Sequence, residues 1–216
     1  MSSTPEAAAG RREHWQQAWT SKPATATSWY QPRPETSLAL IAATGIDHDQ
    51  PLIDIGGGAS TLVDALLADG WRELSVLDIS AAALDVARQR LGADAARVHW
   101  IEADLLAATL MRDYAIWHDR AVFHFLTDAD DRLRYRAQAE ASIRVGGQLI
   151  IGCFAEDGPL KCSGLDVQRH SIESLTEAIG PAFELLETRR ETHLTPMGKE
   201  QRFVYGRYLH RGRGAA

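Results

Sequence analysis

The sequence predicts an α/β protein in which helices cover both faces of a mostly parallel sheet. Short apolar runs that suit buried strands alternate with amphipathic stretches of helical length. A glycine-rich turn, Gly56-Gly57-Gly58, joins the first of these runs to a helix. The last two strand-like runs are separated only by a short turn that contains Pro196 and Gly198. A turn this short allows only antiparallel pairing, so we expect an antiparallel hairpin at one edge of the sheet.

Seven strands are expected, because seven short runs are rich in branched and aromatic apolar residues. They cover residues 52–55, 73–78, 98–101, 114–117, 148–154, 183–194 and 201–209. Helices are expected over residues 35–45, 60–68, 81–91, 105–111, 129–144 and 171–179. Ser80 and Asp128 suit the N-caps of two of these helices, since their side-chain oxygens can accept hydrogen bonds from first-turn amides. Strand and helix alternate as in successive βαβ units.

The chain divides into a short N-terminal segment, one main domain and a tail. The main domain is expected over residues 35–210 and the tail over residues 211–216. Within the N-terminal segment of residues 1–34, residues 1–12 are small and polar, and we expect them to be disordered. The rest of the segment holds four large aromatic residues, Trp15, Trp19, Trp29 and Tyr30. We interpret it as an aromatic lid; the plainer alternative is a set of anchors that closes one edge of the core.

Composition excludes several classes of protein. The chain has 216 residues and a net charge of -6, and it shows no basic cluster that would suit a nucleic acid. Its longest apolar run, residues 38–43, is too short to cross a membrane, and no apolar signal segment is visible. We therefore predict a cytoplasmic protein. Cys153 and Cys162 lack the spacing of metal ligands and are expected to be free thiols, and no metal site is predicted.

Carboxylates follow three of the expected strands at the edge where parallel sheets bind ligands. Asp78 lies 20 residues after Gly58, which is the spacing of an acidic residue that binds ribose hydroxyls. A dinucleotide site needs a small residue where Thr61 stands, and Asp54 would repel a diphosphate. S-adenosylmethionine suits the pattern better, because its ammonium and sulfonium are positive, its ribose suits Asp78 and its adenine amine suits Asp104.

Three stretches resemble the class I S-adenosylmethionine-dependent methyltransferases. Residues 53–60, Ile-Asp-Ile-Gly-Gly-Gly-Ala-Ser, resemble motif I; residues 77–80 resemble the ribose-binding motif; residues 102–105 resemble the adenine-binding motif. Ala59 and Ser60 replace the usual final Thr-Gly pair, and both are small. The resemblance implies a Rossmann-like seven-stranded fold. It assigns cofactor binding to Trp29, Asp54, Gly56, Gly57, Gly58, Ser60, Asp78, Ile79, Asp104, Leu105 and His118.

A second resemblance concerns residues 117–124, Trp-His-Asp-Arg-Ala-Val-Phe-His. An acidic-basic pair in a loop after the fourth strand, opening a helix, is similar to thiopurine and related small-molecule methyltransferases and to some protein-lysine methyltransferases. It implies catalytic roles for Asp119, Arg120 and His124, the last of which would share a helical face with Arg120. The alternatives are a structural ion pair for the first two and a packed core residue for His124. The Asp-Pro-Pro-Tyr motif of base and glutamine N-methylation is absent.

The sequence thus predicts an S-adenosylmethionine-dependent methyltransferase that transfers a methyl group in line to a small-molecule nucleophile, for example a thiol. A protein-lysine methyltransferase of the same fold is the main alternative. A nucleotide-dependent oxidoreductase and a non-catalytic binder are less favoured. The reaction with a general base and the reaction without one stay equally open, and the sequence does not determine the oligomeric state.

Overall fold

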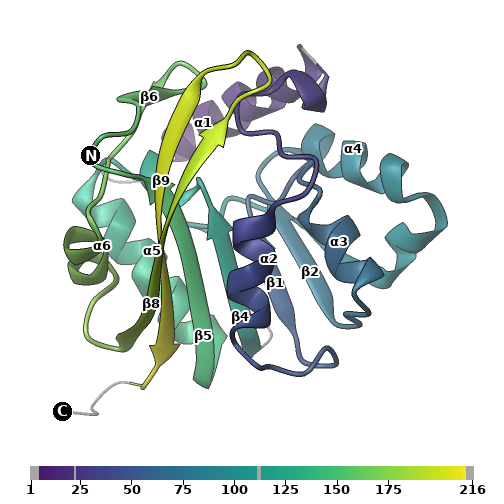
Figure 1. Ribbon diagram of the computed structural model, residues 1–216. Coiled ribbons are helices and arrows are strands. Elements are labelled where there is room, and N and C mark those ends of the chain that lie inside the picture. The colour runs from purple at the N-terminus through teal and green to yellow at the C-terminus, as the bar shows by residue number, and fades with distance from the viewer. Residues whose placement is uncertain (1–4, 22, 111–112, 213–216) are drawn as a thin grey trace.

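One seven-stranded sheet runs through the molecule (Figure 1). The computed structural model describes residues 5–21, 23–110 and 113–212. The sheet order is β3-β2-β1-β4-β5-β9-β8. Pairing is parallel from β3 to β5, and β9 is antiparallel to both β5 and β8. This confirms the predicted Rossmann-like fold with an antiparallel C-terminal edge. The strands are β1 (Leu52–Ile55), β2 (Leu74–Asp78), β3 (Val98–Glu102), β4 (Tyr114–Arg120), β5 (Ile143–Phe154), β8 (Phe183–Leu194) and β9 (Glu200–His210).

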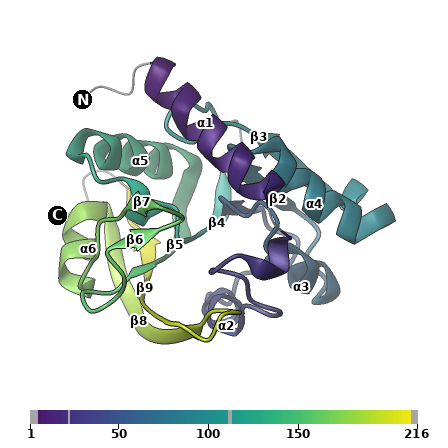
Figure 2. The same cartoon turned by 90° about the horizontal axis from the view of Figure 1, so that it is seen from above.

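Helices cover both faces of the sheet (Figure 2). The α-helices are α1 (Pro5–Thr20), α2 (Glu35–Ala42), α3 (Leu62–Ala68), α4 (Ala81–Leu91), α5 (Ala129–Ser142) and α6 (Ile172–Ile179). Short 3-10 helices are η1 (Ala24–Ala26), η2 (Gly92–Arg97) and η3 (Phe123–Phe125). One buried cluster holds side chains of α2, α3 and α4, such as Leu66 and Leu84. The other holds side chains of α5 and α6, such as Tyr135 and Leu175. The fold therefore has three layers.

Both predicted N-caps are present. Ser80 Oγ accepts a hydrogen bond from the amide of Ala83, and Asp128 Oδ1 accepts one from the amide of Asp130. Cys153 and Cys162 are both buried, and neither forms a disulfide in the described part of the chain. In the part of the chain that the structure describes, no helix is long and apolar enough to cross a membrane.

Four local predictions are wrong. Residues 105–107 form a turn and residues 108–110 have no regular structure, so no helix is present there; Met111 lies outside the described residues. The turn forms because the Asp104 side chain accepts the amide of Leu106, which competes with helical bonding. Residues 5–12, expected to be disordered, are helical as part of α1. β4 runs on to Arg120, so the acidic-basic pair ends a strand rather than lying in a loop. Arg120 and His124 therefore share no helical face.

Two further strands were not predicted. β6 (Lys161–Cys162) and β7 (Leu165–Asp166) form a small antiparallel hairpin after β5. β5 itself begins at Ile143, directly after α5, instead of at residue 148. α1 passes over the carboxyl ends of the strands, as seen from above in Figure 2. This helix, the hairpin and the strand ends surround the site described next.

Candidate functional site

The glycine turn after β1 packs too tightly for any larger residue. Gly56 has a φ of +64°, and a Cβ there would collide with the Val122 side chain. A Cβ on Gly57 would collide with the Asp54 carboxylate, and one on Gly58 would lie 2.6 Å from Asp78 Oδ2. The turn therefore lies directly against two carboxylates. Because glycine has no Cβ, a ligand can come closer to the backbone of this turn than to the backbone of other residues.

Two adjoining cavities open on this turn. The first lies at the ends of β2 and β3 and is mostly apolar. The second lies on the α2 side of the turn and is more polar. Five residues line both cavities: Trp19, Trp29, Ile55, Gly56 and Arg120. Because the cavities share these residues, they lie next to each other at the glycine turn.

Asp78, the last residue of β2, lies at the wall of the first cavity. Its Oδ1 accepts the amide of Ser80 at 2.8 Å. Burial, with a smaller contribution from the charge of Asp54, outweighs the lowering effect of the Ser80 amide, and the pKa of this carboxyl is raised from 3.8 to about 7. Such a group gains much by accepting hydrogen bonds from a ligand's hydroxyl groups, because those bonds favour its ionised form.

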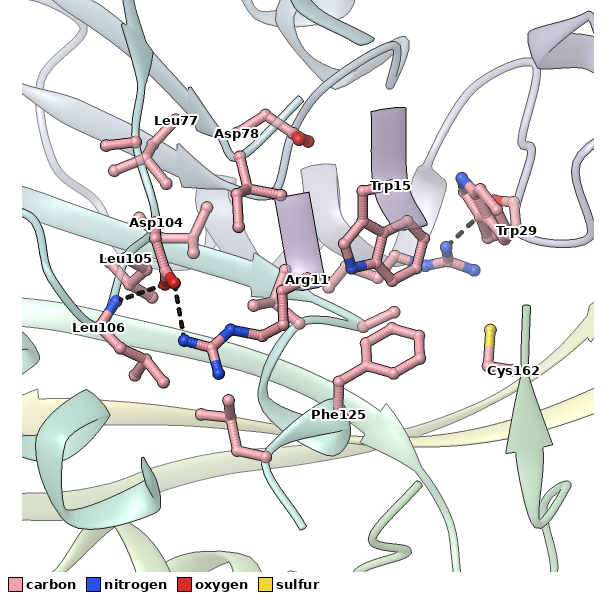
Figure 3. A pocket seen from close by; sticks show the side chains of 18 of the residues that line it. Arg11, Trp15, Trp29, Leu77, Asp78, Asp104, Leu105, Leu106, Phe125 and Cys162 are labelled. Atoms are coloured by element: carbon pink, nitrogen blue, oxygen red, sulfur yellow. Dashed lines mark hydrogen bonds and ion pairs between the residues drawn. The ribbon is translucent and has the colours of Figure 1, made fainter. Parts of the chain in front are cut away.

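Asp104 lies in the same cavity, after the end of β3, and contacts the N-terminal helix (Figure 3). Its Oδ1 accepts the amide of Leu106 at 3.0 Å, and its Oδ2 accepts Arg11 Nη2 at 2.7 Å. The next residue, Arg12, forms an ion pair with Glu102. Two arginines of α1 thus bind two carboxylates at the end of β3. They hold the helix over the cavity.

Further contacts fix α1 and the following segment as a cover. Gln16 Oε1 accepts Ser80 Oγ at 2.9 Å, at the N-terminus of α4. The Trp15 ring packs edge-on against Phe125 and Trp29, with centroid distances of 5.0 and 6.0 Å, and Trp19 packs against Trp29 at 5.5 Å. Figure 3 shows Trp15, Trp29 and Phe125 around one end of the cavity, with Cys162 of β6 nearby. This end is therefore aromatic and apolar.

A buried polar group lies on the wall of the second cavity. His118 Nδ1 hydrogen-bonds Asp54 Oδ1 at 2.7 Å, and His118 Nε2 hydrogen-bonds Ser37 Oγ at 2.9 Å. The three residues come from β4, β1 and α2, and the side chains of Asp54 and His118 are almost fully buried. The arrangement fixes the Asp54 carboxylate beside the glycine turn. It also binds α2 to the sheet.

Asp119 and His124 line neither cavity. Asp119 Oδ1 accepts the Val122 amide at 2.8 Å and its Oδ2 accepts the Tyr135 hydroxyl at 2.7 Å, inside the core. Burial outweighs the lowering effect of the Tyr135 hydrogen bond, and the pKa of Asp119 is raised from 3.8 to about 6. Burial, with the nearby Arg120 charge, lowers the pKa of His124 to about 3, so its ring is neutral at pH 7. Its Nδ1 accepts the amide of Phe154. These contacts stabilise the turn after β4.

Several solved structures are similar in fold to this chain, and two of those described below contain S-adenosylhomocysteine. No family model and no curated protein sequence matches the chain. A protein solved in a study of the conversion of a disulfide bond into a thioacetal group during echinomycin biosynthesis is 16% identical, with a TM-score of 0.75, covering 94% of this chain and 93% of that one. The N-methyltransferase NodS from Bradyrhizobium japonicum WM9, with S-adenosylhomocysteine, is 16% identical (TM-score 0.68; 90% and 97% covered).

A third structure is the 1,6-didemethyltoxoflavin-N1-methyltransferase of Burkholderia thailandensis, with its substrate and S-adenosylhomocysteine. It is 18% identical, with a TM-score of 0.68 and 95% and 89% of the two chains covered. The chain has the class I methyltransferase fold. At these identities the likeness extends to the fold alone.

Most residues predicted to bind the cofactor lie together around the two cavities beside the glycine turn. Ten of the eleven line one or both cavities, and the exception, Gly58, packs against Asp78. Of the three residues predicted to be catalytic, only Arg120 reaches the cavities. Among the described residues, no group of three His, Cys, Asp or Glu side chains could hold a metal ion.

Several residues that line the first cavity were not among the predicted site residues. Arg11 lies in a segment expected to be disordered, and its partner Asp104 is 93 residues away. Phe125 carries no motif signal. Cys162 lies on the β6–β7 hairpin that follows β5, and this hairpin was not predicted either.

Proposed function

We propose that the protein is an S-adenosylmethionine-dependent methyltransferase that acts on a small-molecule nucleophile. One observation carries this proposal. Asp78 and Asp104, at the ends of successive strands, line one cavity, and this cavity is also lined by Gly56, where a Cβ would collide with Val122. Ribose hydroxyls and an adenine amine are hydrogen-bond donors that suit these two carboxylates. The residues present therefore fit an adenosyl ligand. Asp54 suits the ammonium group of its methionine part.

The donor, when bound, supplies a methyl group already activated on a sulfonium. The chain's contribution is then to orient the donor and the acceptor and to exclude water, which can lower the barrier by about 7 kcal/mol or more. Ala121, Val122 and Phe125 follow β4 and bound the apolar end of the first cavity with the tryptophans of the cover. We assign the methyl acceptor to this end.

The cavity residues favour a reaction without a general base. Asp119 and His124 lie outside both cavities, and the low pKa of His124 makes it a weak base. An acceptor that is ionised or soft on arrival, such as a thiol, suits this site better than an ammonium, which must first lose a proton. The enclosed aromatic cavity end also suits a small acceptor better than a protein lysine.

Calorimetric titration tests the donor assignment. S-adenosylmethionine and S-adenosylhomocysteine should bind, and NAD should not. Binding of NAD with no binding of the two methionine-derived ligands would favour an oxidoreductase instead.

The acceptor class needs a separate screen with a radiolabelled donor. Thiols, phenols and amines are offered one by one, and a cell lysate is offered in parallel. Transfer to small thiols supports the proposed class. A labelled protein band would favour the protein-lysine alternative.

We also propose that the N-terminal segment is the lid of this site. Arg11, Trp15, Trp19 and Trp29 all line the first cavity, so removing residues 1–34 would open it to solvent. The truncated chain should lose tight binding of S-adenosylhomocysteine while keeping a cooperative thermal transition. Unchanged affinity would contradict the lid assignment.

A further inference from the structure

Arg120 is the buried cation shared by the two cavities. It ends β4, and the register that pairs Ile55 with Asp119 places it beside Gly56 of the glycine turn. Its side chain is 10% exposed. Its guanidinium carbon lies 4.5 Å from the centroid of the Phe203 ring, which supports the flat face of the group. The position is therefore rigid and close to the ligand path.

Two of the three guanidinium nitrogens are held by protein partners. Nε donates to the Tyr205 hydroxyl at 3.0 Å, and Nη1 donates to the carbonyl of Trp29 at 3.2 Å. Nη2 is buried and has no hydrogen-bond partner in the described part of the chain. A buried donor without an acceptor is costly, so this nitrogen is a candidate contact for a ligand.

Glu191 does not accept a hydrogen bond from Nη2 of Arg120. Its Oε2 lies 3.8 Å from Nη2, which is beyond a hydrogen bond. The same oxygen already accepts the Tyr205 hydroxyl at 2.6 Å, and Oε1 accepts the Gln31 side chain at 2.7 Å. Glu191 balances the charge of Arg120 and fixes its surroundings. The hydrogen-bonding capacity of Nη2 is left for another group.

The charges of the second cavity match those of an amino acid. Its lining combines a buried carboxylate, Asp54, with the guanidinium of Arg120, whose side chain is 10% exposed. The methionine part of an adenosyl donor carries one ammonium and one carboxylate. An adenosyl group held by Asp78 and Asp104 would direct this part past Gly56, which lines both cavities.

We propose that Arg120 binds the carboxylate of the donor's methionine part through Nη2, and so selects the intact amino acid tail rather than acting on the methyl acceptor. The inference rests on the proposed function. It assigns the second cavity to the amino acid and leaves the aromatic end of the first cavity to the acceptor. Arg120 is then a donor-specificity residue.

The test compares S-adenosylhomocysteine with its decarboxylated analogue by calorimetric titration. The wild-type protein should bind the intact ligand about 10- to 100-fold more tightly, as expected for a charge-assisted hydrogen bond. The Arg120→Gln variant should lose this preference, because its affinity for the intact ligand falls while its affinity for the analogue stays. Arg120→Lys keeps the charge without the planar fork and should retain part of the preference. Arg97→Gln, at an exposed arginine that lines neither cavity, is the control and should bind both ligands as the wild type does.

Three outcomes would overturn the inference. The first is equal binding of the two ligands by the wild type, a result that needs no variant. The second is an Arg120→Gln variant that binds both ligands more weakly by the same factor, and the third is a variant with both affinities unchanged. In each case the ligands still bind the wild type, so the proposed function survives. If neither ligand binds the wild type, the proposed function fails and the inference fails with it.

Discussion

Replacing Asp78 with asparagine should stabilise the ligand-free protein at high pH. The folded carboxyl has a pKa of about 7, against 3.8 for an ordinary aspartate, mainly because it is buried. Between these values the folded state holds a proton that the unfolded chain has lost, so stability falls as pH rises. A difference of about three pH units corresponds to about 4 kcal/mol above pH 7. Asparagine has nearly the same shape, keeps an acceptor for the Ser80 amide and carries no charge.

Thermal unfolding of the two proteins from pH 5 to pH 8 measures this effect. At about 2 to 4 °C per kcal/mol, the midpoint of Asp78→Asn should exceed that of the wild type by about 8 to 16 °C at pH 8. The difference should shrink toward pH 5. Asp94→Asn, at an exposed position, is the control and should give no such trend. A gain that does not change with pH, or a less stable variant at pH 8, would refute the reasoning.

The same substitution should act in the opposite direction on ligand binding. The ionised carboxylate is the form that accepts hydrogen bonds from ribose hydroxyls, so wild-type affinity for S-adenosylhomocysteine should rise from pH 6 to pH 8. Asp78→Asn should bind weakly and show little of this rise. A stabilised variant that no longer binds would identify Asp78 as a residue whose burial costs stability in exchange for ligand recognition.

Two further substitutions test the turns beside the cavities. Gly56→Ala should lower stability and S-adenosylhomocysteine affinity more than Gly198→Ala does. Both glycines have positive φ, but only Gly56 is crowded by Val122. Equal effects of the two substitutions in calorimetry and thermal unfolding would argue against the crowding. Asp119→Ala should destabilise by about 2 to 4 kcal/mol in urea unfolding, because the Tyr135 hydroxyl and the Val122 amide lose their buried acceptor. A fully stable Asp119→Ala variant without methyl-transfer activity would instead support a catalytic Asp119.

The sheet and the donor end of the site could be predicted because their signals are local. Each strand is a short apolar run, and Asp78 and the glycine turn lie at fixed distances along the chain. What could not be predicted depends on contacts between distant segments. The role of Arg11 depends on its hydrogen bond to Asp104, which is distant in the sequence. β5 begins early because Ile143 pairs with Tyr114, and its carbonyl accepts His210 Nδ1 from the far end of the chain.

Two of the three predicted catalytic residues, Asp119 and His124, line neither cavity, for a related reason. A pattern of acidic, basic and imidazole side chains after a strand is compatible with a loop or with a continuing strand. Because β4 continues to Arg120, successive side chains point to opposite faces. Asp119 faces the core with Tyr135, whereas Arg120 faces the cavities. The three additional strand residues, 118–120, therefore separate the two interpretations.

The tryptophans of the cover should make the intrinsic fluorescence of the protein sensitive to ligand binding. Three of the six tryptophans, Trp15, Trp19 and Trp29, line the first cavity with ring centroids 5.5 to 6.0 Å apart between neighbours. Rings this close share excitation energy, so a ligand that quenches one of them dims all three. Trp71 and Trp117 are buried away from the cavities and supply a steady background. Arrival of a ligand should therefore be visible in the intrinsic emission of the unlabelled chain.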